Sequence, residues 1–306
     1  AAIIKRNRTQ EMESKVLKKD GLLMPFWYTT FGDAPFGERS LWISMHGGGG
    51  APPEVNTSQW ENQKKLYTLE EGGYLVPRAP TDAWNLWHQA HIDPMFVHLI
   101  ENMIVFEGVD PNRVYITGYS AGGDGVYQLA PRMADRFAAA GMMAGHPNET
   151  KPDGLRNIGF ALHVGGDDTA YDRNNIGRQW KQQLKELQEA DQEGYAHQAV
   201  IHEGKGHWMD RQETMAFPWM AKFTRNPYPR KGVWVHDDVM HDRFYWLGVD
   251  NPTPRTKIVA SIEGQTVTIH EADGFEEITV YFHDAMLDLD QHITLIYGDR
   301  VLRSRV

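Results

Sequence analysis

The sequence contains no cysteine, and this absence excludes several kinds of chemistry. Without a thiol, the chain forms no disulfide, presents no thiolate nucleophile and offers no cysteine ligand to a metal. The absence leaves the cellular compartment open, because a secreted protein can fold without disulfides. A bacterial periplasmic or secreted location is one interpretation.

Long apolar runs and an excess of basic residues are also missing. No stretch approaches the roughly 18 consecutive apolar residues of a membrane-spanning helix, so we expect no membrane partner. The 31 lysines and arginines are outnumbered by 41 aspartates and glutamates, and the net charge is −10. Because the basic footprint of a phosphate-binding surface is missing, we expect no nucleic-acid partner.

The remaining composition is that of a soluble globular protein, with 41% hydrophobic and 24% charged residues among 306. Up to about residue 224, short apolar runs alternate with helical patterns, which is typical of an α/β protein with a mainly parallel sheet. The expected strands cover residues 23–32, 40–47, 74–80, 113–120, 138–147 and 158–166, and one more strand with its exit loop covers residues 197–208. The expected helices cover residues 56–72, capped by Asn56 or Thr57, then 93–108, 121–137, 174–191 and 211–223, the last of them kinked or split at Pro218.

The composition changes near residues 224–232. Helical patterns stop there, and short β-rich runs separated by turn residues follow. We therefore predict two domains: an α/β domain over residues 1–226 and a small antiparallel, sandwich-like β-module over residues 227–306.

The most informative motif lies at the end of the strand expected over residues 113–120. Residues 118–122 read G-Y-S-A-G, the G-x-S-x-G pattern of a sharp turn from a strand into a helix. Such a turn lifts the hydroxyl of Ser120 above the sheet at the helix N-terminus, which suits a nucleophile. The alternative is a glycine-rich turn whose serine only caps the helix.

A serine nucleophile needs a general base and hydrogen-bond donors for the oxyanion that develops during attack. The glycine-rich segment H-G-G-G-G over residues 46–50 follows an earlier strand and leaves its backbone N–H groups uncovered. We predict that Gly47, Gly48 and Gly49 supply donors, together with the N–H of Ala121 directly after the serine. A phosphate-binding loop is not indicated, because the Lys-Ser/Thr pair that completes one is absent.

In this order, H-G-G-G, G-x-S-x-G, an acid and then a histidine resemble the α/β-hydrolase superfamily. The unit over residues 113–147 is similar to polyhydroxybutyrate depolymerases and feruloyl esterases, and more distantly to prolyl-oligopeptidase catalytic domains. The resemblance covers roughly residues 20–224 in the order of elements, and it does not extend to the β-module. It implies a doubly wound, mainly parallel sheet and a serine hydrolase that uses no cofactor.

The superfamily places the acid after the strand two beyond the serine and the histidine after the last strand. The second position holds G-K-G-H-W over residues 204–208, so His207 is the expected general base. Two carboxylates compete for the first position. The family's G-x-x-D pattern selects Asp168, whereas aligning the histidine before the glycine, His163, selects Asp167. We prefer Asp168, because the glycine marks the end of the strand; the acid would orient the imidazole and stabilise the imidazolium.

The substrate surface is expected near the loop that follows the third strand. Aromatic walls suit apolar or sugar-like groups, although the tryptophans of this loop would equally well seal the core. The candidates for substrate contact are Trp84, Trp87, His88, Tyr119 and His146. His88 and His91 lack a carboxylate at ligand spacing, so we assign no metal.

Only residues 148–157 join the strand ending near His146 to the next one. This connection is too short for a folded lid, and we expect an open site that admits small, bulky or polymeric esters. The primary hypothesis is an esterase that works through an acyl-enzyme. A serine peptidase with the same triad and a carbohydrate-binding protein on a hydrolase scaffold are the alternatives, and the oligomeric state stays open.

Overall fold

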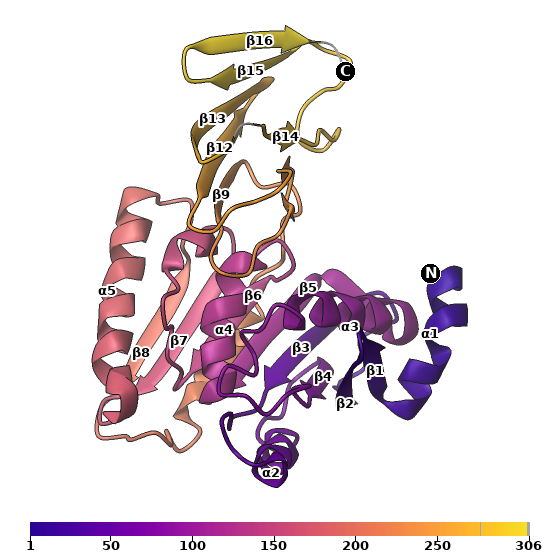
Figure 1. Ribbon diagram of the computed structural model, residues 1–306, viewed down its shortest axis with the longest axis vertical. Coiled ribbons are helices and arrows are strands. Elements are labelled where there is room, and N and C mark those ends of the chain that lie inside the picture. Colours follow the sequence, from indigo (N-terminus) through magenta and orange to yellow (C-terminus); the bar gives the residue numbers. More distant parts are fainter. Residues whose placement is uncertain (276, 305–306) are drawn as a thin grey trace.

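The computed structural model describes residues 1–275 and 277–304, and its largest element is an eight-stranded sheet (Figure 1). The strand order is β1-β2-β4-β3-β5-β6-β7-β8. The bounds are β1 Val16–Lys19, β2 Leu22–Phe31, β3 Arg39–Met45, β4 Gly72–Pro77, β5 Val109–Tyr119, β6 Ala139–Met143, β7 Gly159–Gly165 and β8 His197–His202. The pairs β1–β2 and β2–β4 are antiparallel. All neighbouring pairs from β4 to β8 are parallel, as predicted.

Helices cover the sheet, whose strands β4, β6 and β7 consist mostly of apolar residues and glycine. Every residue of β4, β6 and β7 is buried, which is the pattern of parallel strands enclosed on both faces. The helices are α1 Ala2–Ser14, α2 Pro53–Gln63, α3 Ile92–Glu107, α4 Ala121–Arg132, α5 Arg173–Ala190 and α6 Ala216–Met220. Short 3-10 turns are η1 Pro152–Leu155, η2 Ala170–Asp172 and η3 Gln212–Met215.

Three elements differ from the prediction. The helix expected over residues 56–72 begins at Pro53 and ends at Gln63, since proline suits the first helical turn. The helix expected over residues 211–223 is divided into η3 and α6, and the division falls after Met215, not at Pro218. The N-terminal helix α1 was not expected at all. Met12 is its only buried residue, so its sequence carries no apolar period from which a helix could be detected.

The C-terminal region, from residue 231 on, consists of two small sheets. One has the order β16-β15-β13-β12-β9 and the other β10-β11-β14. Their strands are β9 Lys231–Val235, β10 Arg243–Phe244, β11 Leu247–Gly248, β12 Lys257–Glu263, β13 Thr266–Asp273, β14 Thr279–Val280, β15 Ile293–Tyr297 and β16 Arg300–Ser304. The pairs are antiparallel except β13–β15, which is parallel. Trp234 of β9 stacks on Phe244 of β10 with ring centroids 5.7 Å apart, so the two sheets pack through aromatic side chains.

These sheets rest on the main sheet's helices. The Tyr245 hydroxyl donates to the carbonyl of Ala134 at 2.8 Å, and His241 Nε2 lies 2.7 Å from Asp93 Oδ2. In Figure 1 the small sheets form the top of the molecule, whereas α2 lies at the bottom. Within the described ranges, no helix is both long enough and apolar enough to cross a membrane.

Candidate active site

Ser120 stands on a strained turn between β5 and α4. Its backbone has φ 58° and ψ −122°, a region that residues with a side chain seldom occupy and that costs about 1–3 kcal/mol. The flanking glycines make the turn possible. A Cβ on Gly118 would collide with the carbonyl of Gly122, and a Cβ on Gly122 would collide with the carbonyl of Met45. The motif is therefore explained by close backbone approach, and the turn exposes the hydroxyl.

Three loops bring a serine, an imidazole and a carboxylate into contact in series. His207 Nε2 lies 2.9 Å from Ser120 Oγ, and His207 Nδ1 lies 2.7 Å from Asp168 Oδ2. The Asp168 side chain is 2% exposed, whereas that of His207 is 43% exposed. The carboxylate is thus shielded from water while the imidazole faces the solvent side. This contact is made by Asp168; the neighbouring Asp167 is exposed.

Arg173 lies behind this series. Its Nη1 is 3.7 Å from Asp168 Oδ1, and its side chain is 10% exposed. The guanidinium therefore neutralises the buried carboxylate from the side opposite His207. Sequence reasoning had no signal for this contact, because the pairing depends on the turn between β7 and α5.

The glycine loop lies against the serine. A Cβ on Gly47 would stand 3.3 Å from Ser120 Cβ, and Gly47 and Gly48 both line the pocket beside the hydroxyl. Among the described residues, no acceptor binds the backbone N–H of Gly48 or Ala121. Gly49 differs from the expectation, since its N–H donates to Asn56 Oδ1 at 2.8 Å. That N–H is therefore occupied and is not a free oxyanion donor.

Tyr119 joins the serine turn to the histidine loop. Its hydroxyl donates to the carbonyl of His207 at 2.7 Å and accepts the N–H of Met209 at 3.1 Å. Burial raises the pKa of Tyr119 above its ordinary value. The hydroxyl therefore stays protonated and keeps both bonds. Tyr119 also lines the pocket.

A pocket of about 490 Å³ opens at Ser120, and one face of α2 forms its wall. Sequence reasoning did not identify this wall, which contributes Val55, Gln59, Asn62 and Gln63. The spacing of these four residues places them on a single helix face. The rest of the lining consists of Gly47, Gly48, Leu66, Tyr119, Ser120, His207 and Trp208. No lysine, arginine, aspartate or glutamate of the described chain lines the pocket, so it is suited to neutral groups.

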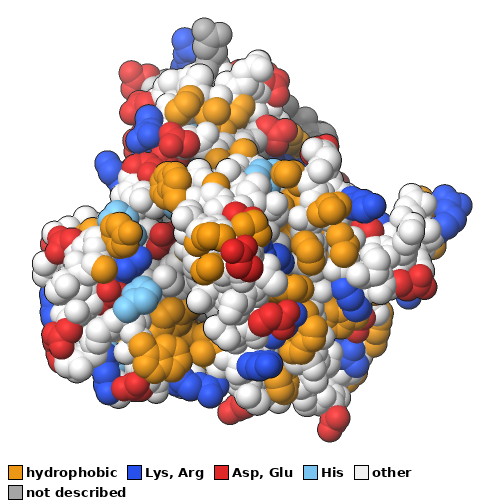
Figure 2. Space-filling view, turned by 60° about the horizontal axis from the view of Figure 1, so that its bottom comes forward, with side chains coloured by type: hydrophobic (Ala, Val, Ile, Leu, Met, Phe, Trp, Pro, Cys, Tyr) orange, Lys and Arg blue, Asp and Glu red, His pale blue; other side chains and the backbone are white. Residues whose placement is uncertain are grey.

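The site is open to solvent. Trp208 is 50% exposed and Val55 is 43% exposed. The face turned forward in Figure 2 carries hydrophobic side chains next to histidine side chains, with charged side chains scattered around them. The connection from β6 to β7 contains only the short turn η1. The expectation of a fold without a lid domain is confirmed.

The other candidates for substrate contact lie outside this pocket. Trp87 is fully buried and donates its Nε1–H to the carbonyl of His46 at 2.9 Å, so it belongs to the core and cannot touch a substrate. Trp84 is 63% exposed, and its ring packs edge-on against that of His88 with the ring centroids 5.6 Å apart. Burial, together with nearby positive charge, lowers the pKa of His88 to about 4, so this side chain is neutral.

His146 lies on the α4 side of the serine turn. Its backbone N–H donates to Asp124 Oδ1 at 2.6 Å. Burial raises the pKa of Asp124 to about 6. The His146 ring accepts the N–H of Asn148 at 2.9 Å, and the described pocket does not include it.

No protein-family model matches the sequence, and no curated protein matches it in sequence. Solved structures do match. A thermostable esterase aligns at 19% identity with a TM-score of 0.52, over 69% of this chain and 62% of that chain. The alignment thus spans less than two thirds of that esterase.

Two further solved structures are a ferulic acid esterase (14% identity, TM-score 0.48, 68% of this chain, 95% of that chain) and Est1E from Butyrivibrio proteoclasticus (12%, 0.45, 68%, 95%). The strand order and the likeness to the thermostable esterase establish that the chain has the α/β-hydrolase fold. The predicted fold class is confirmed.

Proposed function

We propose that the protein is a serine hydrolase that cleaves carboxylic esters through an acyl-enzyme. Ser120 is the nucleophile, His207 the general base and Asp168 the acid that holds the imidazole in the Nδ1–H tautomer. The backbone N–H groups of Gly48 and Ala121 are the oxyanion donors, with Gly47 beside them. The observation that carries the proposal is the hydrogen-bonded series Ser120–His207–Asp168, at 2.9 and 2.7 Å. The fold shared with a thermostable esterase supports it.

The reaction follows from this series. Ser120 Oγ attacks the ester carbonyl carbon while His207 Nε2 takes the hydroxyl proton, and the carbonyl oxygen becomes an oxyanion. Collapse of this intermediate breaks the bond to the alcohol, which leaves with the proton from His207. Water then attacks the acyl-enzyme by the same steps and releases the carboxylic acid. No cofactor takes part.

The pocket favours neutral esters. Its polar lining includes the carboxamides of Gln59 and Asn62, and its apolar lining includes Trp208 and Leu66. Carboxamides bind hydroxyl or carbonyl groups without charge. The open mouth admits a bulky alcohol or a polymer chain. Peptide substrates would react with the same triad and serve as the comparison.

We also propose that residues 1–226 form the catalytic domain and residues 227–306 a C-terminal β-module that takes no part in the chemistry. All residues lining the pocket precede residue 226. In Figure 1 the small sheets lie at the opposite end of the molecule from α2.

The test replaces the nucleophile. Ser120→Ala should lower kcat/KM for p-nitrophenyl acetate by at least about 10⁴-fold, and wild-type protein should take up a fluorophosphonate probe at Ser120. Ser58→Ala is the matched control, because Ser58 is an exposed serine on α2 outside the pocket. An undiminished rate in Ser120→Ala would refute the nucleophile. Faster cleavage of Xaa-Pro anilides than of any ester would favour the peptidase.

A further inference from the structure

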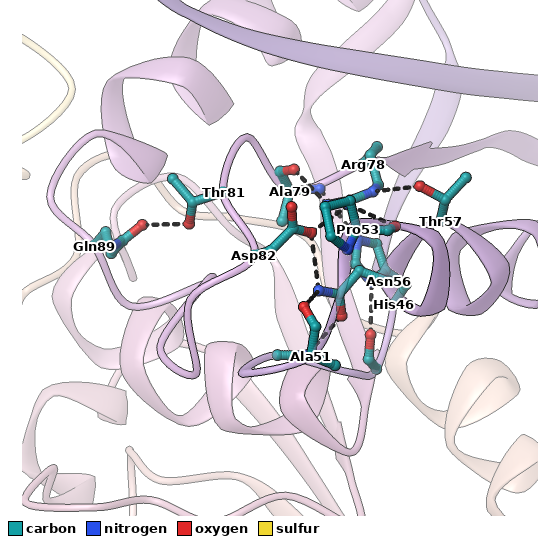
Figure 3. A network of polar contacts seen from close by, with 12 residues as sticks. His46, Ala51, Pro53, Asn56, Thr57, Arg78, Ala79, Thr81, Asp82 and Gln89 are labelled. Carbon is teal, nitrogen blue, oxygen red and sulfur yellow. Dashed lines mark hydrogen bonds and ion pairs between the residues drawn. The ribbon is translucent and has the colours of Figure 1, made fainter.

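Asn56 is a buried amide that does not cap its helix. Because α2 begins at Pro53, Asn56 lies inside the first turn, and its side chain is fully buried. Its carboxamide reaches the glycine-rich segment over residues 47–51, which we call the oxyanion loop (Figure 3). Oδ1 accepts the N–H of Gly49 at 2.8 Å, and Nδ2 donates to the carbonyl of Ala51 at 3.1 Å. The amide therefore binds the oxyanion loop on both sides of Gly50.

A carboxylate and a guanidinium hold this amide in place. Asn56 Nδ2 also donates to Asp82 Oδ1 at 2.8 Å, and Arg78 forms an ion pair with the same oxygen. Although partial burial opposes it, hydrogen bonds from Arg78 and Asn56 hold the pKa of Asp82 below its usual value. The carbonyl of Asp82 accepts the N–H of Gly50 at 3.0 Å. The amide's acceptor and both of its donors are thus engaged, which leaves one orientation for the side chain.

His46 fixes the start of the oxyanion loop. Its Nε2 accepts the N–H of Ala79 at 3.1 Å, so the ring proton must lie on Nδ1, which donates to the carbonyl of Gly47 at 2.6 Å. Burial lowers the pKa of His46 to about 4 and keeps this tautomer neutral. The imidazole of His46 therefore binds the oxyanion loop at Gly47, and the amide of Asn56 binds it at Gly49 and beyond.

The oxyanion loop needs such contacts because of its backbone. Gly48, Gly49 and Gly50 have φ of 107°, 86° and 57°, three successive residues in a region that favours glycine. Glycine adopts this region freely, and for the same reason fixing its backbone costs more conformational entropy than fixing that of other residues. An oxyanion donor is effective only when it is aimed before the reaction begins. Contacts on either side of Gly48 would supply that preorganisation.

We propose that Asn56 is a positioning residue for the oxyanion hole. By binding the N–H of Gly49 and the carbonyl of Ala51, it holds the loop so that the N–H of Gly48 faces the oxyanion formed at Ser120. It also withdraws the Gly49 N–H from that role. Asn56 itself does not touch the substrate. This inference rests on the proposed function of Ser120.

The experiment compares Asn56→Ala with wild type. The expected result is a loss of about 10²-fold in kcat/KM for p-nitrophenyl acetate, mainly in kcat, because removal of one oxyanion donor costs about 10²–10³-fold. The affinity for a trifluoromethyl ketone, whose adduct with the serine carries the oxyanion, should fall by the same factor. A residue that only stabilised the fold would leave the ketone affinity of the folded variant unchanged.

Asn102→Ala is the matched control. Asn102 is also fully buried, with hydrogen bonds of 3.2 Å to Arg8 and Glu11, and it lies on α3 outside the pocket. It should lose stability in urea unfolding but keep kcat/KM within about twofold. If Asn56→Ala does not fold, Asn56→Leu replaces it, because leucine has a similar volume and forms none of the three hydrogen bonds of the amide.

Two outcomes overturn the inference in distinguishable ways. A folded Asn56 variant with wild-type affinity for the ketone, in a protein whose Ser120 reacts with fluorophosphonate, refutes the role of Asn56 alone. Failure of wild-type Ser120 to react refutes the proposed function and the inference with it.

Discussion

Replacement of Tyr119 by phenylalanine removes the hydroxyl that joins the serine turn to the histidine loop. That hydroxyl contacts the carbonyl of His207 at 2.7 Å and the N–H of Met209 at 3.1 Å. Both partners belong to the loop that carries His207, the proposed general base. The ring of phenylalanine preserves the contact with Trp208, whose centroid lies 5.8 Å away. The variant therefore tests the two hydrogen bonds with little change in packing.

The stability cost follows from burial. Met209 is fully buried, so its N–H would lose its partner in a site that water does not reach, at a cost of about 1–3 kcal/mol. The carbonyl of His207 belongs to an exposed residue and can bind water instead. We therefore expect a loss of about 2 kcal/mol in the free energy of unfolding.

The kinetic effect follows from position. A displacement of about 1 Å in a catalytic group costs about 10²-fold, and the His207 loop would lose two of the bonds that hold it. We expect kcat for p-nitrophenyl acetate to fall by about 10- to 100-fold with KM little changed. A pure substrate contact by Tyr119 would instead raise KM and leave kcat unchanged.

Steady-state kinetics and urea unfolding of Tyr119→Phe test both values. Tyr195→Phe is the matched control, because the buried Tyr195 hydroxyl donates only to the carbonyl of Asp153, at 3.0 Å and outside the pocket. The control should lose about 1 kcal/mol and no activity. Wild-type kcat in Tyr119→Phe, with a stability loss no greater than the control's, would refute the reasoning.

Two further predictions concern the acid and a buried histidine. Asp168→Asn should lower kcat/KM by about 10⁴-fold and Asp167→Asn by no more than about twofold, because Asp168 accepts the Nδ1–H of His207; equal losses in steady-state kinetics would contradict this assignment. Burial lowers the pKa of His46 to about 4, below the value of about 6.5 in an unfolded chain. Between pH 4 and pH 6.5 the imidazole of His46 is therefore protonated in the unfolded chain and neutral in the folded protein. Stability present above pH 6.5 is lost as the pH falls toward 4, by about 2 kcal/mol at pH 5. Urea unfolding at pH 7 and pH 5 measures how much the free energy of unfolding falls between these pH values. The fall should be smaller in His46→Gln than in wild type by this amount, and an equal fall in both proteins would disprove the linkage.

Much of the fold could be predicted because its signals are local. Apolar strands alternating with helical patterns predict a parallel α/β sheet, and the β5–α4 turn was recognisable because only glycine fits at Gly118 and Gly122. The N-terminal helix α1 was missed because its sequence has no apolar face. The parallel β13–β15 pair was also not predicted, because the sequence of a short strand does not indicate which strand it will pair with.

The site divides in the same way. The sequence alone determined the strained serine turn, the glycine-rich loop and the histidine-bearing exit of β8, because each depends on backbone demands within a few residues. Only the tertiary structure decided that His207 contacts Asp168 rather than Asp167, that Trp87 belongs to the core and that α2 forms the wall of the pocket. It also decided that Asn56 occupies the N–H of Gly49. These outcomes depend on which side chains from distant segments meet in space, and the direction in which a loop side chain points is set by its packing partners, not by its neighbours in the chain.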